Sequence, residues 1–185
     1  IETDANLFDT SIFTDTTITN STAQTSGFGS SSILGLVLAN SIYFICGGGT
    51  PYKFSSSVDG VTWTARSLSF GNSSARSVAF GAGVYVVIGN DGKLETSTDG
   101  ITWTTRTSSF GSTTILKVVF VNDLFIAVGL SGKIATSLDG IAWTQRTSGF
   151  SSISVNDVAF GAGVYVVVGN DGEVETSPDG INWTS

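Results

Sequence analysis

The chain repeats itself with a period of 40 residues. The motif Ser-x-Asp-Gly-x-x-Trp occurs four times in one register. Its fixed positions are Ser57, Ser97, Ser137 and Ser177, then Asp59, Asp99, Asp139 and Asp179, then Trp63, Trp103, Trp143 and Trp183. Repeats of 20 to 50 residues are typical of solenoids and propellers, in which one supersecondary unit recurs and packs on its neighbours. Any fold for this chain must therefore be built from about four equivalent units.

Each copy of the repeat is expected to form four short strands. In the fourth copy these are residues 157–161, 164–169 and 173–177, with a last strand that begins at Ile181. The turns between them contain Ala162-Gly163 and Asn170-Asp171-Gly172, and residues of this kind accept the positive φ of tight hairpins. No segment has a helical period, and β-branched and aromatic residues dominate between the turns. The predicted fold class is all-β.

Four antiparallel strands in about 40 residues, repeated, fit the blades of a β-propeller. After a Ser/Thr/Asp-rich N-terminal arm, residues 1–24, the expected blades are residues 25–66, 67–106, 107–146 and 147–185. The second strands, such as residues 84–88, are apolar at every position, as in a strand covered on both faces. Four blades are the lower limit of a closed propeller, and we expect closure. The alternative is an arc of a larger propeller, with edges that need partners.

Composition narrows the classes of partner. With 41% hydrophobic and 12% charged residues the chain is not a disordered one,. Its 15 acidic residues outnumber 8 scattered basic ones, so nucleic acid is not an expected partner,. The longest apolar stretch, residues 33–46, is interrupted and too short to cross a bilayer, so we expect no membrane insertion. A start at Ile1 without any methionine is typical of a processed end or a fragment,.

The repeated motif makes physical sense as a fold element. An Asp at a hairpin accepts hydrogen bonds from nearby backbone N–H groups, a Ser does so more weakly, and Gly supplies positive φ. The Trp is expected to point into the core, where such a ring buries about 150–250 Å². Each motif offers one carboxylate and one hydroxyl, too few for a calcium loop. Equivalent carboxylates spread around a ring also cannot form a catalytic pair. We interpret the motifs as structural.

The motif resembles the Asp-box, or bacterial neuraminidase repeat, over residues 25–185. This family occurs in β-propellers of sialidases and other glycosidases, in photosystem assembly factors, and in bacterial and phage surface proteins. The resemblance implies that the boxes are structural and lie away from any active site. The family pattern has one residue between Asp and Gly. Here the Gly follows directly, at Gly60, Gly100, Gly140 and Gly180, so we expect a turn that is tighter by one residue.

The resemblance to sialidases raises an enzymatic alternative. Sialidases grip a carboxylate with three arginines and use a Tyr nucleophile. Here Arg66, Arg106 and Arg146 are repeat equivalents, which indicates a repeated packing or interblade hydrogen-bonding role, and Tyr85 and Tyr165 lie in apolar strands. Only Arg76 is outside the repeat. The chain has no His and one Cys, Cys46, expected to be buried, so we expect no metal, no cofactor and no enzyme,.

Binding is the function that the sequence favours. In a propeller, the loops between second and third strands share a face with the connections between blades. The candidate ligand-binding residues there are Thr50, Tyr52, Asn90, Asp91, Asn170 and Asp171. We expect a non-enzymatic structural or adhesive module of an extracellular assembly, such as a phage tail fibre or spike or a bacterial surface protein. Its expected partners are other protein subunits, as a homo-oligomer or a larger assembly, and a surface glycan. The alternatives are a fragment of a sialidase-like glycoside hydrolase and a soluble assembly factor of a membrane complex.

Overall fold

A computed structural model describes residues 25–49 and 53–185 of the chain. The expected N-terminal arm and the candidates Thr50 and Tyr52 lie outside these residues. The described residues form four antiparallel sheets, each within one copy of the repeat, which confirms the all-β prediction. This part of the chain contains no helix long and apolar enough to cross a membrane.

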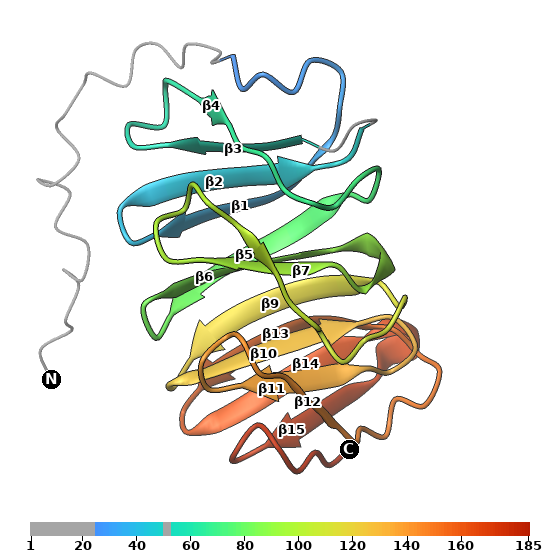
Figure 1. Cartoon of the computed structure of the whole chain (residues 1–185). Coiled ribbons are helices and arrows are strands. Elements are labelled where there is room, and N and C mark those ends of the chain that lie inside the picture. Colours follow the sequence, from blue (N-terminus) through green and yellow to red (C-terminus); the bar gives the residue numbers. More distant parts are fainter. Residues whose placement is uncertain (1–24, 50–52) are drawn as a thin grey trace, which may run out of the picture.

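Each sheet pairs its strands in sequence order and is one propeller blade, numbered here from the N-terminus (Figure 1). Blade 1 contains β1 (Ile33–Ala39), β2 (Ile42–Gly47), β3 (Lys53–Ser57) and β4 (Thr64–Ala65). Blade 2 contains β5 (Ala75–Gly81), β6 (Val84–Gly89), β7 (Leu94–Ser97) and β8 (Thr104–Thr105). Blade 3 contains β9 (Ile115–Val121), β10 (Leu124–Gly129), β11 (Ile134–Ser137) and β12 (Thr144–Arg146). Blade 4 contains β13 (Val155–Gly161), β14 (Val164–Gly169) and β15 (Val174–Ser177).

The hairpin turns follow the sequence prediction, but the last strand does not. In the turn after β6, Asp91 and Gly92 have φ of 55° and 65°, and the Lys93 N–H donates to the Asn90 carbonyl. The prediction of a fourth strand from Ile181 is wrong. The Asp179 carboxylate holds the N–H groups of Ile181 and residue 182 in a turn, as the equivalent carboxylates do in the other blades, so pairing begins only after this turn, at a bridge between Thr176 and Thr184.

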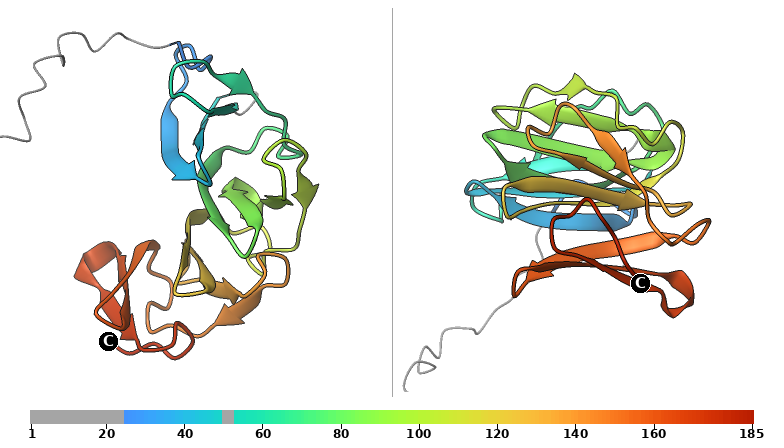
Figure 2. Two further views of the ribbon diagram at one scale, coloured as in Figure 1. Left: turned by 90° about the vertical axis from the view of Figure 1, so that its left-hand side faces the viewer. Right: turned by 90° about the horizontal axis from the view of Figure 1, so that it is seen from below.

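The four blades stand side by side in an arc (Figure 2). Their first strands are innermost, and β1 lies beside β5, β5 beside β9, and β9 beside β13. Blades 1 and 4 stand at the two ends of the arc. The expected closure of four blades is therefore not what the structure shows. The rotation from one blade to the next is too small for four blades to complete a circle.

The hydrophobic core lies between the blades. Three separate clusters join blade 1 to blade 2, blade 2 to blade 3, and blade 3 to blade 4. Every residue of β6 and of β10 is buried, which confirms the prediction of second strands covered on both faces. Residues of β2 and β14, in the end blades, are partly exposed. A strand is thus fully covered only where its blade has two neighbours.

Candidate binding site on the inner strands

The Asp-box turns are closed by hydrogen bonds within the box. Asp99 Oδ1 accepts the N–H groups of Ile101 and Thr102, each at 2.8 Å, and the Ser97 hydroxyl donates to the same oxygen at 2.8 Å. The Gly100 N–H donates to Ser97 Oγ, and φ at Gly100 is +71°. The other three boxes repeat these bonds.

These bonds favour the ionised carboxylate. The backbone N–H groups of Thr102 and Ile101 lower the pKa of Asp99 to about 2. The pKa values of Asp59, Asp139 and Asp179 are lowered for the same reason, chiefly by two backbone N–H groups each. Each box carboxylate is thus an internal hydrogen-bond acceptor of its own turn.

The boxes also join neighbouring blades. A methyl group on Gly100 would meet the ring of Phe44, in blade 1, at 2.9 Å, so the turn of blade 2 packs tightly on its neighbour. The Trp103 ring centroid lies 5.2 Å from that of Phe54, also in blade 1. In blade 3 the Trp143 indole N–H donates to the Gly140 carbonyl at 2.9 Å. The box is therefore a contact between blades as well as a turn.

The three repeated arginines act inside their own blades. Arg66 Nε donates to Ser56 Oγ, Arg106 Nε to Thr96 Oγ1, and Arg146 Nε to Thr136 Oγ1, at 2.7 to 3.0 Å. Each bond joins the third and fourth strands of one sheet, so these contacts are not between blades. Because the three lie at the outer strands of three different blades, the structure does not bring them together around one carboxylate. Tyr85 and Tyr165 are buried.

Of the predicted loop residues that the structure describes, Asn90, Asp91 and Asn170 each use one side-chain oxygen in a hydrogen bond within the chain. Asn90 Oδ1 accepts from Arg76 Nε, and Asp91 accepts from the Ser73 hydroxyl. Since Ser73 belongs to the connection from blade 1, these loops and the connections do share a face. Asn170 Oδ1 likewise accepts from the amide of Asn156. Asp171 is exposed in its turn with φ of 58°.

The inner strands carry different side chains at equivalent positions of the four copies. One equivalent position holds Gly35, Ser77, Lys117 and Asp157 on β1, β5, β9 and β13. The preceding position holds Leu34, Arg76, Leu116 and Asn156. The strand register shifts at this point in each blade, and such bulges re-aim side chains near binding sites,. The repeat thus keeps its scaffold and varies its inner surface.

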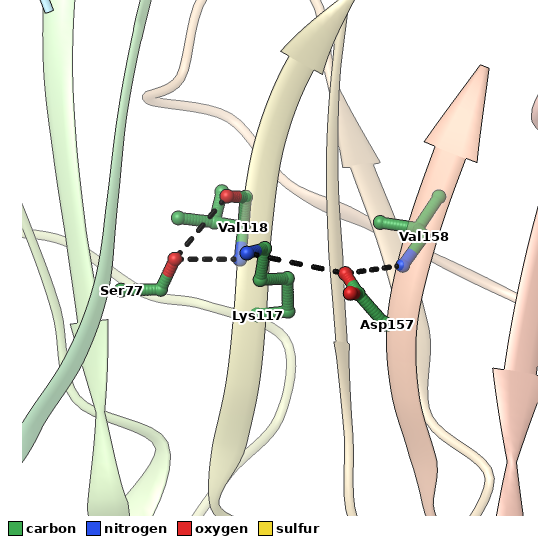
Figure 3. Close-up of polar contacts among 5 residues, drawn as sticks. All are labelled: Ser77, Lys117, Val118, Asp157 and Val158. Atoms are coloured by element: carbon green, nitrogen blue, oxygen red, sulfur yellow. Dashed lines mark hydrogen bonds and ion pairs between the residues drawn. The ribbon is translucent and has the colours of Figure 1, made fainter. Parts of the chain in front are cut away.

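Side chains at the position of Ser77, Lys117 and Asp157 link β5 to β9 and β9 to β13 (Figure 3). The Ser77 hydroxyl accepts from the Val118 N–H at 3.4 Å and donates to its carbonyl at 3.3 Å. Lys117 Nζ lies 4.0 Å from Asp157 Oδ1, in a pair whose side chains are 42% and 58% exposed. An exposed pair of this kind contributes little to stability, because water screens it. The Lys117 charge therefore remains accessible to a ligand.

The inner strands line a groove of about 620 Å³, called the inner groove below. Its lining comes mainly from β1, β5 and β9 and combines polar and apolar surface, with Leu34 and Phe120 among its apolar residues. Arg76 and Lys117 are the charged residues of this lining, and both are basic. The chain as a whole carries a net charge of −7, so the groove differs in sign from the rest of the molecule.

A second hollow of about 410 Å³ lies at the loop face of blade 3 and is polar. Its two cations are occupied, because Lys133 Nζ donates to the Phe110 carbonyl and Arg146 Nε to Thr136. Among residues 25–49 and 53–185 there is no group of three or more metal-ligating side chains. Cys46 is buried, and burial raises the pKa of its thiol to about 12.

Sequence reasoning missed the inner groove. The available signal was the aperiodic Arg76, which marks the place where the copies diverge. Aligning the copies at Gly35, Ser77, Lys117 and Asp157 shows four different kinds of side chain at one position of the inner strands. The sequence motifs consist of the residues that repeat, whereas binding specificity depends on the residues that differ between copies.

No family model matches the chain, and no curated protein matches it. Among solved structures it is similar to YCF48 from Cyanidioschyzon merolae, at 22% identity over 83% of this chain and 55% of that chain, with a TM-score of 0.63. YCF48 bound to D1 peptide matches at 18% identity over 83% and 52%, also with a TM-score of 0.63. The WD40 β-propeller domain of Doa1 matches at 12% identity over 82% and 53%, with a TM-score of 0.60.

The chain thus spans about half the length of these three neighbours. At such identities the likeness concerns the fold. With the four sheets described above, it makes this chain an arc of β-propeller blades.

Proposed function

We propose that the chain is a non-enzymatic binding module that holds an extended, acidic segment of a partner protein in its inner groove. The observation that carries the proposal is the lining of the groove, which combines apolar side chains with two cations and no carboxylate, in an acidic chain. An extended segment with alternating apolar and acidic side chains matches such a lining.

Arg76 and Lys117 have distinct parts in this proposal. Asn90 accepts the Nε–H of Arg76 and thereby holds the guanidinium at the end of β5 that leads to the loop face. A guanidinium has five N–H donors, so it retains donors for a carboxylate. Lys117 contributes a mobile charge, because a ligand carboxylate can replace its exposed contact with Asp157 at little cost,.

The neighbours support a protein ligand only by analogy. One of the similar structures is of YCF48 bound to D1 peptide, so a protein with this fold binds a peptide. Propellers serve many functions on one scaffold, and function is argued from the site rather than from the fold. The chemistry of the groove, rather than this likeness, is therefore the basis for the choice of an acidic segment.

The test is selection from a random peptide library displayed on phage, with the full chain immobilised as the target. We expect the selected peptides to be enriched in Asp, Glu and large apolar residues. The variant with both Arg76→Glu and Lys117→Glu should lose these peptides. Lys93→Glu is the matched control, because the equivalent residue of blade 4 is already Glu173. Equal selection by the groove variant and the unmodified chain would refute the proposal.

The setting of this module remains a prediction. Low charge and high Ser/Thr content favour a structural or adhesive part of an extracellular assembly, such as a virion or a bacterial surface. A glycan array on the same chain separates an adhesive role from peptide binding, since a sugar ligand should be retained by the groove variant if it binds at the loop face. Hydrolysis of a fluorogenic sialoside would instead support the glycoside hydrolase alternative.

A further inference from the structure

Contacts between blades always join two unlike faces. The trailing face of blade 2 presents Val84, Val86, Ile88 and Leu94, and the leading face of blade 3 presents Phe110, Ile115, Val118 and Phe125. All of these residues are buried in one cluster. The contact between blades 3 and 4 uses the equivalent residues: Leu124, Ile126, Val128 and Ile134 against Phe150, Val155, Val158 and Tyr165.

At the ends of the arc, one face of each kind lacks a partner among residues 25–49 and 53–185. On the trailing face of blade 4, Val168 and Val174 are 40% and 47% exposed, whereas the equivalent Ile88 and Leu94 of blade 2 are 0% and 1% exposed. On the leading face of blade 1, Leu36 is 68% exposed, whereas its equivalents in the other blades are buried. Exposed apolar surface of this extent marks an interaction site.

The first Asp-box gives an independent indication. The box glycines of blades 2, 3 and 4 pack against the preceding blade so closely that a methyl group would overlap Phe44, Val86 or Leu124. A methyl group on Gly60, in blade 1, would meet within 4 Å only Tyr43 of the same blade, at 3.8 Å. This box has the shape of an interblade contact but faces no blade.

We propose that a second copy of this chain covers both faces. The trailing face of blade 4 in each copy packs on the leading face of blade 1 in the other, and the two arcs close one ring. Two arcs of four blades give a ring of eight, which is within the range of about four to eight blades known for propellers. A head-to-tail contact that closes in this way yields a finite symmetric assembly rather than a filament.

The two faces also differ from the other interblade faces in opposite directions of size. The trailing face of blade 4 is smaller than that of blade 2, since Val168 and Val174 replace Ile88 and Leu94. The leading face of blade 1 is larger at the facing position, where Leu36 replaces the valines of the other blades. Along the inner strands, Asp157 would be followed by Gly35 of the second copy, which has no side chain to collide with it. These features favour the chain's own second copy over an unrelated partner.

The test is the mass of the full chain in solution, by size-exclusion chromatography with light scattering. We expect twice the 19.1 kDa of one chain. Val174→Asp should give single chains, because it places a charge in one contact face, and Leu36→Asp should do so through the other. Leu138→Asp is the matched control, since Leu138 is 74% exposed but belongs to an Asp-box turn outside both faces.

Mixing the two variants is the decisive step. Each retains the face that the other has lost, so an equal mixture should recover the double mass through one intact contact. Small-angle scattering on the unmodified chain should show a closed ring, and this measurement does not depend on any variant folding. Single chains at all concentrations, a double mass that survives both substitutions, or a mixture that stays single would each overturn the proposal. Peptide selection tests the inner groove separately.

Discussion

A single carboxylate oxygen organises each Asp-box turn. Asp99 Oδ1 accepts two backbone N–H groups and a serine hydroxyl, so one atom fixes three donors. Because all three bonds favour the charged form, the carboxylate ionises more readily in the folded chain than in the unfolded one. The same bonds that shape the turn therefore make its stability depend on pH.

Asp99→Asn should lower the thermal midpoint at pH 7, because the amide oxygen is a weaker acceptor than a carboxylate. The pKa of Asp99 falls from 3.8 to about 2 on folding, so its contribution is complete above pH 3.8 and is lost as the pH falls through 2,. Melting curves of both proteins should thus converge as the pH is lowered from 4 towards 2. Thr102→Asn is the control, since blade 4 has Asn182 at that position. A difference that stays constant with pH would contradict this account.

The contribution of Glu95 to stability has the opposite dependence on pH. Its side chain is buried and accepts the Ser69 N–H at 2.7 Å, and burial raises its pKa above 4.5. The stability that it contributes is complete below pH 4.5 and is lost as the pH rises through the folded pKa. Glu95→Gln keeps the acceptor and removes the charge, so we expect a higher melting temperature at pH 7 and none of this gain at pH 4. Glu95→Ala should be less stable at both values, because the Ser69 N–H loses its acceptor. An unchanged melting temperature of Glu95→Gln at pH 7 would contradict the interpretation that Glu95 carries a buried charge.

At the scale of single elements, the sequence predicts most strands and turns because their signals are local. Alternating turn residues and β-branched runs place the first three strands of each blade to within a residue or two. The predicted start of the fourth strand is too early, because the Asp179 carboxylate accepts the Ile181 N–H and pairing begins only at Thr184. The β-bulges of the inner strands could not be predicted either. A shift in strand register depends on the neighbouring strand and has no motif in the sequence.

The close approach of β1 to β5 should make Gly35 intolerant of a side chain. A methyl group there would stand 2.5 Å from the Arg76 carbonyl oxygen and 2.8 Å from Cys46 Sγ. Overpacking of this kind costs about 1–3 kcal/mol, so Gly35→Ala should reduce the free energy of urea unfolding by that amount. Gly161→Ala, on β13, is the control because its methyl group would meet nothing within 4 Å. Equal stability of the two variants would show that the inner strands can separate freely.

For the whole molecule, the number of blades could be read from the sequence, but the closure of the ring could not. The period gives four units, and nothing in a repeat states the rotation between one unit and the next. That rotation follows from how the facing side chains pack, as in the cluster that joins β6 and β10. The inner groove has the same origin, because it forms only when the inner strands of different blades stand together.

The rate of amide hydrogen exchange should differ between the middle and the end blades of a single chain. Amides of β6 and β10 lie in strands covered on both faces, so they should exchange slowest, while in single chains those of β14 should exchange faster,. Mass spectrometry of peptic peptides measures this order. In the proposed ring, Val174→Asp should accelerate exchange in β14 and leave β10 unchanged. Uniform protection of all second strands in single chains would conflict with the observed burial.

The inner position shared by Gly35, Ser77, Lys117 and Asp157 has one further consequence. Each blade contributes one residue there, while the turns, tryptophans and second strands that determine the fold lie elsewhere. In the proposed binding module, a mutation of Ser77 or Lys117, which line the inner groove, would therefore change what is recognised without a new scaffold having to evolve. Duplication of blades followed by drift at this single site is a short evolutionary route from one specificity to another.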